Sequence, residues 1–196
     1  MQNESVAAAI LAGGRASRMD GNDKGLLLLD RISLFARVIS RIEPHVDEIL
    51  VTANRNLQFY SGFGHKVLSD EGFGPLSGLR HAMRSANHPL ILTLPCDTPF
   101  FPENLVSALK HGLIETGAQI AIPESAGETH QALMLCKQEL LADLDEFLEH
   151  GGRKVLDWQK RHEHVLVSFP EPDAFFNINT PDDLRLAESI CSAGRR

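Results

Sequence analysis

The sequence predicts an α/β fold of three layers, in which helices cover both faces of a mostly parallel sheet. Short apolar runs alternate along the chain with longer segments of helical periodicity. One run, residues 90–94, is apolar almost throughout, as expected of a central parallel strand covered on both faces. Glycine, proline and charged residues follow several of these runs, where parallel strands would end and ligands usually bind.

Each element follows from its apolar pattern and its boundary residues. We expect strands over residues 6–11, 48–52, 66–69, 90–94, 119–122, 131–135 and 165–169. We expect helices over residues 34–42, 76–85, 102–113, 140–148 and 154–160, followed by a last helix that starts at Thr180-Pro181. Pro102 would stand in the first turn of its helix, and Gly151-Gly152 would end the helix before them.

Length, charge and cysteine content exclude several classes of protein. The 196 residues suit one domain spanning residues 1–196, and 43% hydrophobic with 23% charged residues is typical of a soluble globular chain. The formal net charge of −7 argues against nucleic-acid binding through phosphate contacts. Three cysteines without a C-x-x-C pair argue against a disulfide scaffold or a zinc ribbon. The first apolar run is too short to span a bilayer, so we expect a cytoplasmic protein without a membrane anchor.

The loop after the first strand concentrates positive charge in an otherwise acidic chain. Gly13-Gly14 allows a sharp turn whose N–H groups can approach a phosphate, and Arg15, Arg18 and Lys24 follow within ten residues. The pattern favours a triphosphate site. The alternative is a glycine-rich surface loop with solvated charges. Neither a P-loop nor a dinucleotide-binding motif is present.

Two further loops carry an aspartate where a strand should end. Asp70 comes after the third predicted strand and could bind ribose or base, although an Asp-initiated turn explains it equally well. Asp97 follows the central strand between Pro95 and Pro99, where it is well placed to hold Mg²⁺. A simple turn aspartate is the alternative there. Cys96 could be read as a nucleophile, but a small buried thiol beside a strand is the simpler interpretation.

A late polar motif precedes the last helix. Asn177 and Asn179 would point to the same side of an extended segment, where their amide oxygens could face a metal or a nucleotide. The alternative is that Asn179 or Thr180 caps the last helix, and we expect at least one of them to do so.

Together these motifs resemble the molybdenum cofactor guanylyltransferase (MobA-type) family, part of the nucleotidyltransferase group with a Rossmann-like fold. The resemblance rests on Leu11-Ala12-Gly13-Gly14, Arg18-Met19, Asp23-Lys24-Gly25, Gly74 to Gly78, Pro95 to Pro99, His130-Gln131, Arg153-Lys154 and Asn177 to Pro181. These motifs occur in the family's order over nearly the whole chain. Leu-Ala-Gly-Gly favours the guanylyl branch over the cytidylyl branch, which typically has Leu-Ala-Ala-Gly. Asp20 departs from the family's Arg-Met-Gly-Gly pattern.

The resemblance implies transfer of GMP from GTP to molybdenum-molybdopterin, with release of pyrophosphate. The catalytic residues would be Asp97, holding Mg²⁺ as the cofactor, together with Lys24 and Arg18, which would stabilise the phosphates. The nucleotide would be bound by Leu11, Ala12, Gly13, Gly14, Lys24, Thr52, Asn54, Asp70, Gly78 and Asp97. The pterin side would include His130, Arg153, Lys154, Asn177 and Asn179.

The implied partners are GTP and molybdopterin, with no nucleic acid and no membrane. Transient contact with proteins that insert molybdenum or deliver the cofactor to molybdoenzymes stays open. Two alternatives also stay open: a related nucleotidyltransferase that uses CTP or a sugar phosphate, and a non-enzymatic GTP-binding module that handles the cofactor.

Overall fold

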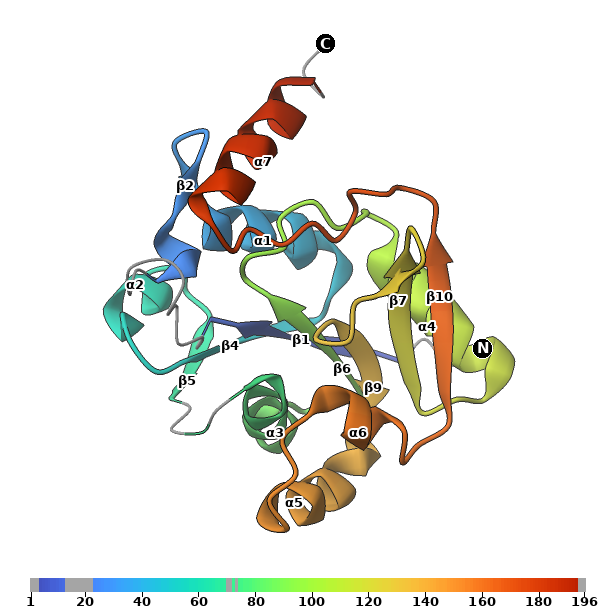
Figure 1. The fold of residues 1–196 in the computed structure, drawn as a ribbon. Helices are drawn as coiled ribbons and strands as arrows, with labels where there is room; N and C mark the ends of the chain where they lie inside the picture. The colour runs from blue at the N-terminus through green and yellow to red at the C-terminus, as the bar shows by residue number, and fades with distance from the viewer. Residues whose placement is uncertain (1–3, 13–22, 70–71, 73, 194–196) are drawn as a thin grey trace.

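A mixed β-sheet lies between two layers of helices in the computed structural model, which describes residues 4–12, 23–69, 72 and 74–193 (Figure 1). The strands in spatial order are β10 (His164–Phe169), β7 (Ile120–Ser125), β9 (Met134–Lys137), β6 (Leu90–Pro95), β1 (Val6–Leu11), β4 (Glu48–Ala53) and β5 (Lys66–Ser69), and β8 (Glu128–Thr129) pairs with β7. Pairing along this order is parallel except at β9, which runs antiparallel to both β6 and β7. The predicted three-layer α/β fold is confirmed.

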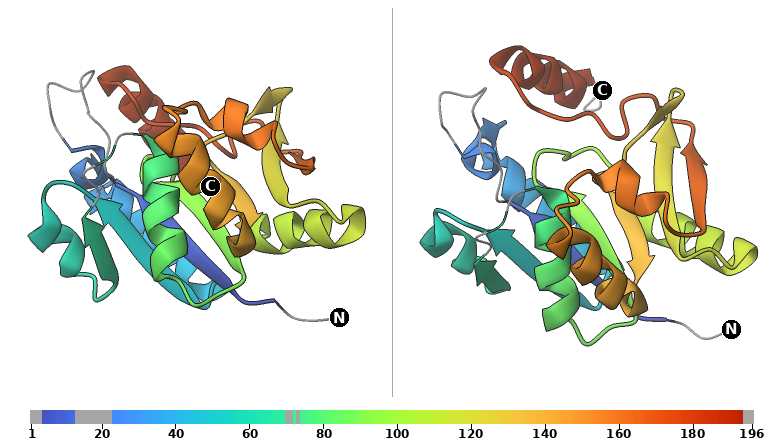
Figure 2. Two further views of the ribbon diagram at one scale, coloured as in Figure 1. Left: turned by 90° about the horizontal axis from the view of Figure 1, so that it is seen from below. Right: turned by 60° about the horizontal axis from the view of Figure 1, so that its bottom comes forward.

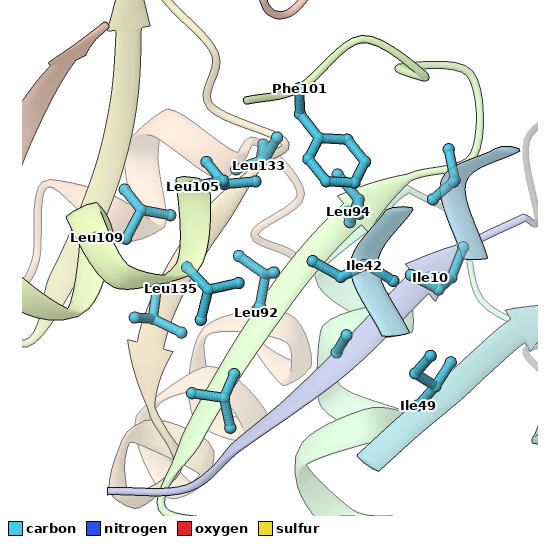
Figure 3. Packing of buried hydrophobic residues seen from close by; sticks show 14 of the residues in the cluster. Ile10, Ile42, Ile49, Leu92, Leu94, Phe101, Leu105, Leu109, Leu133 and Leu135 are labelled. Atoms are coloured by element: carbon cyan, nitrogen blue, oxygen red, sulfur yellow. The ribbon is translucent and has the colours of Figure 1, made fainter. Parts of the chain in front are cut away.

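The central strand β1 is buried on both faces because successive side chains point to opposite sides of the sheet. Ala8 and Ile10 join one apolar cluster, while Ala7 and Ala9 join a second cluster on the other face. Figure 3 shows part of the first cluster, in which Ile10 and Leu92 from the strands lie among side chains from the covering helices. Burial on both faces explains the continuous apolar character of these strands.

Helices from separate parts of the chain form the two covering layers. One face is covered by α1 (Leu34–Ile42) and α4 (Leu105–Thr116), and the other by α3 (Pro75–Ser85), α5 (Leu141–Glu149) and α6 (Val155–Gln159). Both views in Figure 2 show α3 and α5 side by side. Arg84 of α3 donates to Asp145 of α5 at 2.7 Å, which ties these two helices together at the surface.

Two predicted elements begin three residues later than expected, and each shift has a local cause. Helix α4 begins at Leu105 rather than at Pro102, because residues 102–105 form a turn in which the Leu105 N–H donates to the Pro102 carbonyl at 3.1 Å. The strand expected over residues 131–135 begins at Met134. A turn closed by the Leu133 N–H and the His130 carbonyl, 3.0 Å apart, precedes it.

Several short elements were not predicted. They are the hairpin β2 (Leu28–Leu29) and β3 (Ile32–Ser33), the helix α2 (Leu57–Ser61), the strand β8 and the 3₁₀ helices η1 (Lys24–Leu26), η2 (Glu43–His45) and η3 (Gln138–Leu140). The hairpin turn has Asp30 and Arg31 at φ of 50° and 67°, as a two-residue type I′ turn requires. The sequence there is Asp30-Arg31, without the Asn-Gly or Asp-Gly pair that usually indicates such a turn.

The last helix, α7 (Pro181–Ala193), begins where the sequence predicts. The Thr180 hydroxyl accepts a hydrogen bond from the Asp183 N–H at 3.1 Å, and the Asp183 carboxylate accepts from the N–H groups of Asn179 and Thr180 at 2.9 Å. These reciprocal bonds form a capping box, which fixes the end of the segment that carries Asn177 and Asn179. No helix in the described part of the chain is long and apolar enough to cross a membrane.

Candidate functional site

The carboxyl ends of β1, β4 and β6 form one edge of the sheet, and the candidate site lies there. The strand register places Leu11 beside both Thr52 and Pro95. The Ala12 N–H extends this row by donating to the Thr52 carbonyl at 2.9 Å, and the Leu11 carbonyl accepts from the Cys96 N–H at 3.2 Å. The loops after these strands therefore start from adjacent positions.

Helix α3 packs closely against this row through Gly78. A Cβ atom at Gly78 would lie 2.8 Å from both the Leu11 side chain and the Thr52 hydroxyl oxygen. The structure therefore brings together Leu11, Ala12, Thr52 and Gly78. Asn54 is the first residue after β4 and is exposed. The predicted site residues Gly13, Gly14, Arg18 and Asp70 lie outside the described residues.

A polar cluster of Lys24, Asp97 and Asn179 joins three distant parts of the chain. The Lys24 ammonium donates to Asp97 Oδ2 at 2.8 Å and also donates to the side-chain oxygen of Asn179. The Asp97 side chain is 14% exposed and that of Lys24 is 24% exposed, so the ion pair is largely shielded from solvent. The Ile178 N–H donates to the Asp97 carbonyl at 3.0 Å, which fixes the late segment against the loop after β6.

The oxygens of this cluster fit a hard divalent cation. The Asp97 carboxylate and the Asn179 amide oxygen both face the same positively charged group, the Lys24 ammonium. Mg²⁺ prefers oxygen ligands and is commonly held by one or two carboxylates together with water and substrate phosphates. Both the charge and the donor type at Asp97 therefore suit the predicted Mg²⁺.

A cavity of about 330 Å³ lies beside this cluster. It is lined by Pro95, Thr98, Glu128, Thr129, His130, Gln131, Ala132, Leu133, Phe175 and Asn177. The Thr98 hydroxyl donates to the side-chain oxygen of Asn177, so two lining residues belong to the same segments as Asp97 and Asn179. The volume lies at the lower end of the range for small-molecule sites.

His130 forms one wall of the cavity and is held in place on two sides. Its ring lies 4.7 Å from the ring of Phe175, and its Nε2 is 2.9 Å from the Ser125 hydroxyl oxygen. Burial lowers the pKa of His130 below its ordinary value, so the neutral imidazole is favoured at neutral pH. A neutral imidazole offers both a hydrogen-bond donor and an acceptor.

Arg153 and Lys154 are not brought into the polar cluster. The Arg153 guanidinium donates to the carbonyls of Leu148 and Gly152, at 2.8 and 2.5 Å, and so closes the end of α5. Lys154 stands directly before α6. Within the described residues, no recorded hydrogen bond or ion pair joins either side chain to Lys24 or Asp97.

The Cys96 thiol is a structural group. Cys96 is 6% exposed and packs in the first apolar cluster. Burial, reinforced by the neighbouring Asp97 carboxylate, raises the pKa of Cys96 well above its usual value. A thiol that does not ionise is a poor nucleophile, which supports the simpler interpretation of this residue.

Five residues of the cavity wall carried no sequence signal, namely Glu128, Thr129, Ala132, Leu133 and Phe175. The turn before β9 supplies residues 128–133, and Phe175 comes from the segment after β10. Because β9 is antiparallel to β6, with Met134 beside Thr93, the start of β9 lies at the edge where β6 ends. A strand's direction is not visible in its apolar pattern, so within this turn only the family resemblance at His130-Gln131 pointed to a site.

Comparison with known proteins identifies the family of this chain. Residues 8–165 match the family described as MobA-like NTP transferase domain. The chain is 41% identical over 192 residues to the molybdenum cofactor guanylyltransferase of Shewanella halifaxensis, with 95% of this chain and 96% of that protein covered. It is 42% identical over 193 residues to the protein of the same name from Shewanella baltica strain OS155, with 96% and 98% covered.

Solved structures share the fold. Molybdopterin-guanine dinucleotide biosynthesis protein A from Archaeoglobus fulgidus superposes with a TM-score of 0.79 at 25% identity, covering 95% of this chain and 99% of that one. A CMP:2-keto-3-deoxy-manno-octonic acid synthetase complexed with CTP gives a TM-score of 0.77 at 15% identity, with 97% and 99% covered. The latter similarity concerns the fold alone.

Proposed function

Because the chain belongs to the family of MobA-like NTP transferase domains, we propose that it transfers GMP from GTP to molybdenum-molybdopterin. The products are molybdopterin guanine dinucleotide and pyrophosphate. The observation that carries this proposal is the Lys24–Asp97–Asn179 cluster at the carboxyl end of the central strands, directly beside a cavity for a second substrate.

In this reaction a terminal phosphate oxygen of the pterin attacks the α-phosphorus of GTP. The bond between the α-phosphorus and the bridging oxygen breaks, and pyrophosphate leaves with the electron pair. The attacking oxygen is already anionic near neutral pH, so no strong general base is required. Catalysis depends on alignment of the two substrates and on neutralisation of negative charge.

Lys24 supplies positive charge for the phosphates. An ammonium group has three N–H donors, and those of Lys24 are shared between Asp97 and Asn179 in two bonds. Within the described residues this leaves a third donor, which we assign to a phosphate oxygen of GTP or of the leaving pyrophosphate. Arg18 is proposed as a second cation, because Arg binds phosphate oxygens in a bidentate manner.

Asp97 and Asn179 are the proposed protein ligands of Mg²⁺. When bound, the ion would supply Lewis-acid neutralisation of phosphate charge and would align the reacting oxygens. The Asp97 backbone is held in place, because its carbonyl accepts a hydrogen bond from the Ile178 N–H. The hydroxyl of the neighbouring Thr98 also donates a hydrogen bond to the Asn177 side chain.

The guanosine side is proposed along β1, β4 and the start of α3. Leu11, Ala12, Thr52 and Gly78 form a closely packed row, to which Gly13, Gly14, Asn54 and Asp70 are added from the loops. Pro75 opens α3, whose first N–H groups suit a ligand oxygen. Backbone groups can read the base edge here without a long side chain.

The cavity at His130 is the proposed pterin side. A neutral His130 and the Asn177 amide provide donors and acceptors for a pterin edge, and Phe175 provides an apolar surface. Asn179 connects this side to the phosphates. Arg153 and Lys154 would add positive charge at the turn between α5 and α6.

We further propose that residues 1–196 act as one catalytic unit in the cytoplasm. The Cys96 and Cys136 thiols are buried and form no disulfide within the described residues, which suits a reducing compartment. The partners are GTP and molybdopterin, with transient contact to molybdenum-insertion or molybdoenzyme-delivery proteins as a further proposal.

A nucleotide panel tests this function. The protein is incubated with molybdopterin and Mg²⁺ together with GTP, CTP, UTP or ATP, and pyrophosphate release is measured. Release with GTP alone is expected. Preference for CTP would favour the related nucleotidyltransferase, and tight GTP binding without turnover would favour a non-enzymatic module.

A further inference from the structure

Asp23 is a buried carboxylate with a partner on every side. The residue is 7% exposed. Its Oδ1 accepts from the Tyr60 hydroxyl at 2.7 Å and from the Gly25 N–H at 3.2 Å. Its Oδ2 accepts from the Asn56 amide at 2.9 Å and lies 3.7 Å from Arg55 Nε. A buried charge is retained only when it is paired and hydrogen-bonded in this way.

Asp23 fixes the backbone from which the Lys24 side chain extends. It is the N-cap of η1, and its carbonyl accepts from the Leu26 N–H at 3.1 Å. The Lys24 carbonyl accepts from the Leu27 N–H, also at 3.1 Å, so both sides of Lys24 are held. The short helix thus directs the Lys24 ammonium toward Asp97, 2.8 Å away.

The tyrosine on the other side of Asp23 is itself immobilised. Tyr60 is fully buried, and its ring packs edge-to-face on Phe35 at 4.7 Å and on Phe59 at 5.2 Å. A Cβ atom at Gly25 would lie 2.5 Å from the Tyr60 hydroxyl oxygen, so only glycine leaves room for this approach. Burial raises the pKa of Tyr60 far above its usual value, which keeps the hydroxyl a donor.

These contacts connect the two loops that contribute to the nucleotide side. Arg55 and Asn56 lie in the turn after β4, three and four positions beyond Thr52, whereas Asp23 ends the segment after β1. Asn56 has a φ of 51°, in the left-handed region. The hydrogen bond from its side-chain amide to the Asp23 carboxylate helps to hold this conformation.

We propose that Asp23 and Tyr60 are positioning residues that hold the Lys24 ammonium against Asp97 and so set the rate of guanylyl transfer. Neither side chain contacts the substrate in this proposal. The inference rests on the proposed role of Lys24 in the reaction.

A double-mutant cycle tests the proposal. Tyr60→Phe removes only the hydroxyl group and keeps the aromatic packing, and we expect kcat to fall roughly tenfold to a hundredfold, as small misplacements of catalytic groups do. The KM for molybdopterin should stay within about twofold, because the acceptor side is not touched. In a Lys24→Met background, Tyr60→Phe should cause no further loss, since both changes act through one group.

Ser61→Ala is the matched control. Ser61 is the next residue of α2, and its hydroxyl donates to the Leu57 carbonyl at 2.8 Å on the exposed side, so this variant also loses one hydroxyl hydrogen bond. It should keep wild-type kcat. Wild-type kcat in Tyr60→Phe, or losses that multiply in the double variant, would overturn the proposal.

A second variant keeps the test decisive if Tyr60→Phe does not fold. Asn56→Gly removes the amide donor to Asp23 at an exposed position whose positive φ glycine accepts without strain. A several-fold loss of kcat that vanishes in the Lys24→Met background is expected. Wild-type kcat in this variant would then overturn the proposal. If Lys24→Met alone keeps full activity, the proposed role of Lys24 fails instead, which is a distinct result.

Discussion

The Lys24 ammonium and the Asp97 carboxylate lie 2.8 Å apart, although 73 positions separate them in the sequence. They meet because β1 and β6 are neighbouring parallel strands whose following loops leave the same edge of the sheet. From the sequence alone, Lys24 is expected to bind phosphates and Asp97 is expected to hold a metal. The structure makes them one shielded ion pair, so a change at either residue leaves the other without its partner.

Replacement of Asp97 should abolish most of the activity. We expect Asp97→Ala to lower kcat/KM more than about a hundredfold, because loss of charge neutralisation at the phosphates is worth several kcal/mol. Pyrophosphate release is measured over a range of Mg²⁺ concentrations. Asp157→Ala, which removes an exposed carboxylate on α6, is the control and should be unaffected. Near-normal transfer by Asp97→Ala would remove this residue from the proposed metal role.

Removal of the Lys24 charge should weaken GTP binding. A hydrogen bond to a charged group contributes about 1.5–3 kcal/mol, so Lys24→Ala should raise the Kd for GTP by roughly tenfold to a hundredfold. Isothermal titration calorimetry measures this directly. Lys66→Ala, which removes an exposed lysine on the edge strand β5, should leave the Kd unchanged. Equal affinities for wild type and Lys24→Ala would contradict the phosphate role.

A methyl group at Gly78 should disturb both stability and nucleotide binding. Its Cβ would lie 2.8 Å from Leu11 and Thr52, and overpacking of this kind costs about 1–3 kcal/mol. We expect Gly78→Ala to lower the urea midpoint and to raise the KM for GTP. Gly64→Ala is the contrasting variant, because its φ of +80° costs roughly 1–2 kcal/mol while no described residue other than its chain neighbours lies within 4 Å of the new methyl group. It should lower the midpoint only, and a matching change in KM would refute the specific role of Gly78.

His130 should make stability dependent on pH in a defined direction. Burial lowers its pKa in the folded state, so the unfolded chain takes up the proton first as the pH falls. Stability is therefore fully present above the ordinary pKa of about 6.5 and is lost as the pH falls through the lower folded-state pKa. Urea unfolding of wild type and His130→Gln at pH 7.5 and pH 5.5 measures this difference. The wild type should lose more stability than the variant on acidification, and parallel losses would argue against a buried neutral His130.

Much of the fold could be predicted because burial on both faces leaves a clear trace in sequence. The apolar runs at β1, β4 and β6 follow from the two layers of helices that cover them. The start of the last helix could be predicted from Thr180, which caps it, and from Pro181, its first residue. In contrast, Pro102 predicted a helix start that lies three residues too early, since proline also suits the turn that precedes α4.

The candidate site could be predicted only in part. Asp97, Thr52 and Leu11 follow the rule that ligands gather at the carboxyl ends of parallel strands, and the structure places them at one edge. The cavity wall at His130 precedes an antiparallel strand, so the same rule does not find it. The hydrogen bond from the Tyr60 hydroxyl to Asp23 joins residues 37 positions apart in the sequence, and no local sequence pattern indicates such a pairing.

Because β9 runs antiparallel to β6 and β7, the segment before β9 reaches the same edge of the sheet as the loops after β1 and β6. The proposed nucleotide side combines β1, β4 and the start of α3, whereas residues 128–133, the largest continuous part of the cavity wall, come from the segment between β7 and β9. That segment begins and ends at the same edge of the sheet. Backbone hydrogen bonds hold it there, such as the one from the His130 N–H to the Pro123 carbonyl at 3.0 Å. If the proposed acceptor role is right, replacement of this one segment would change which acceptor binds and would leave the proposed nucleotide side unchanged.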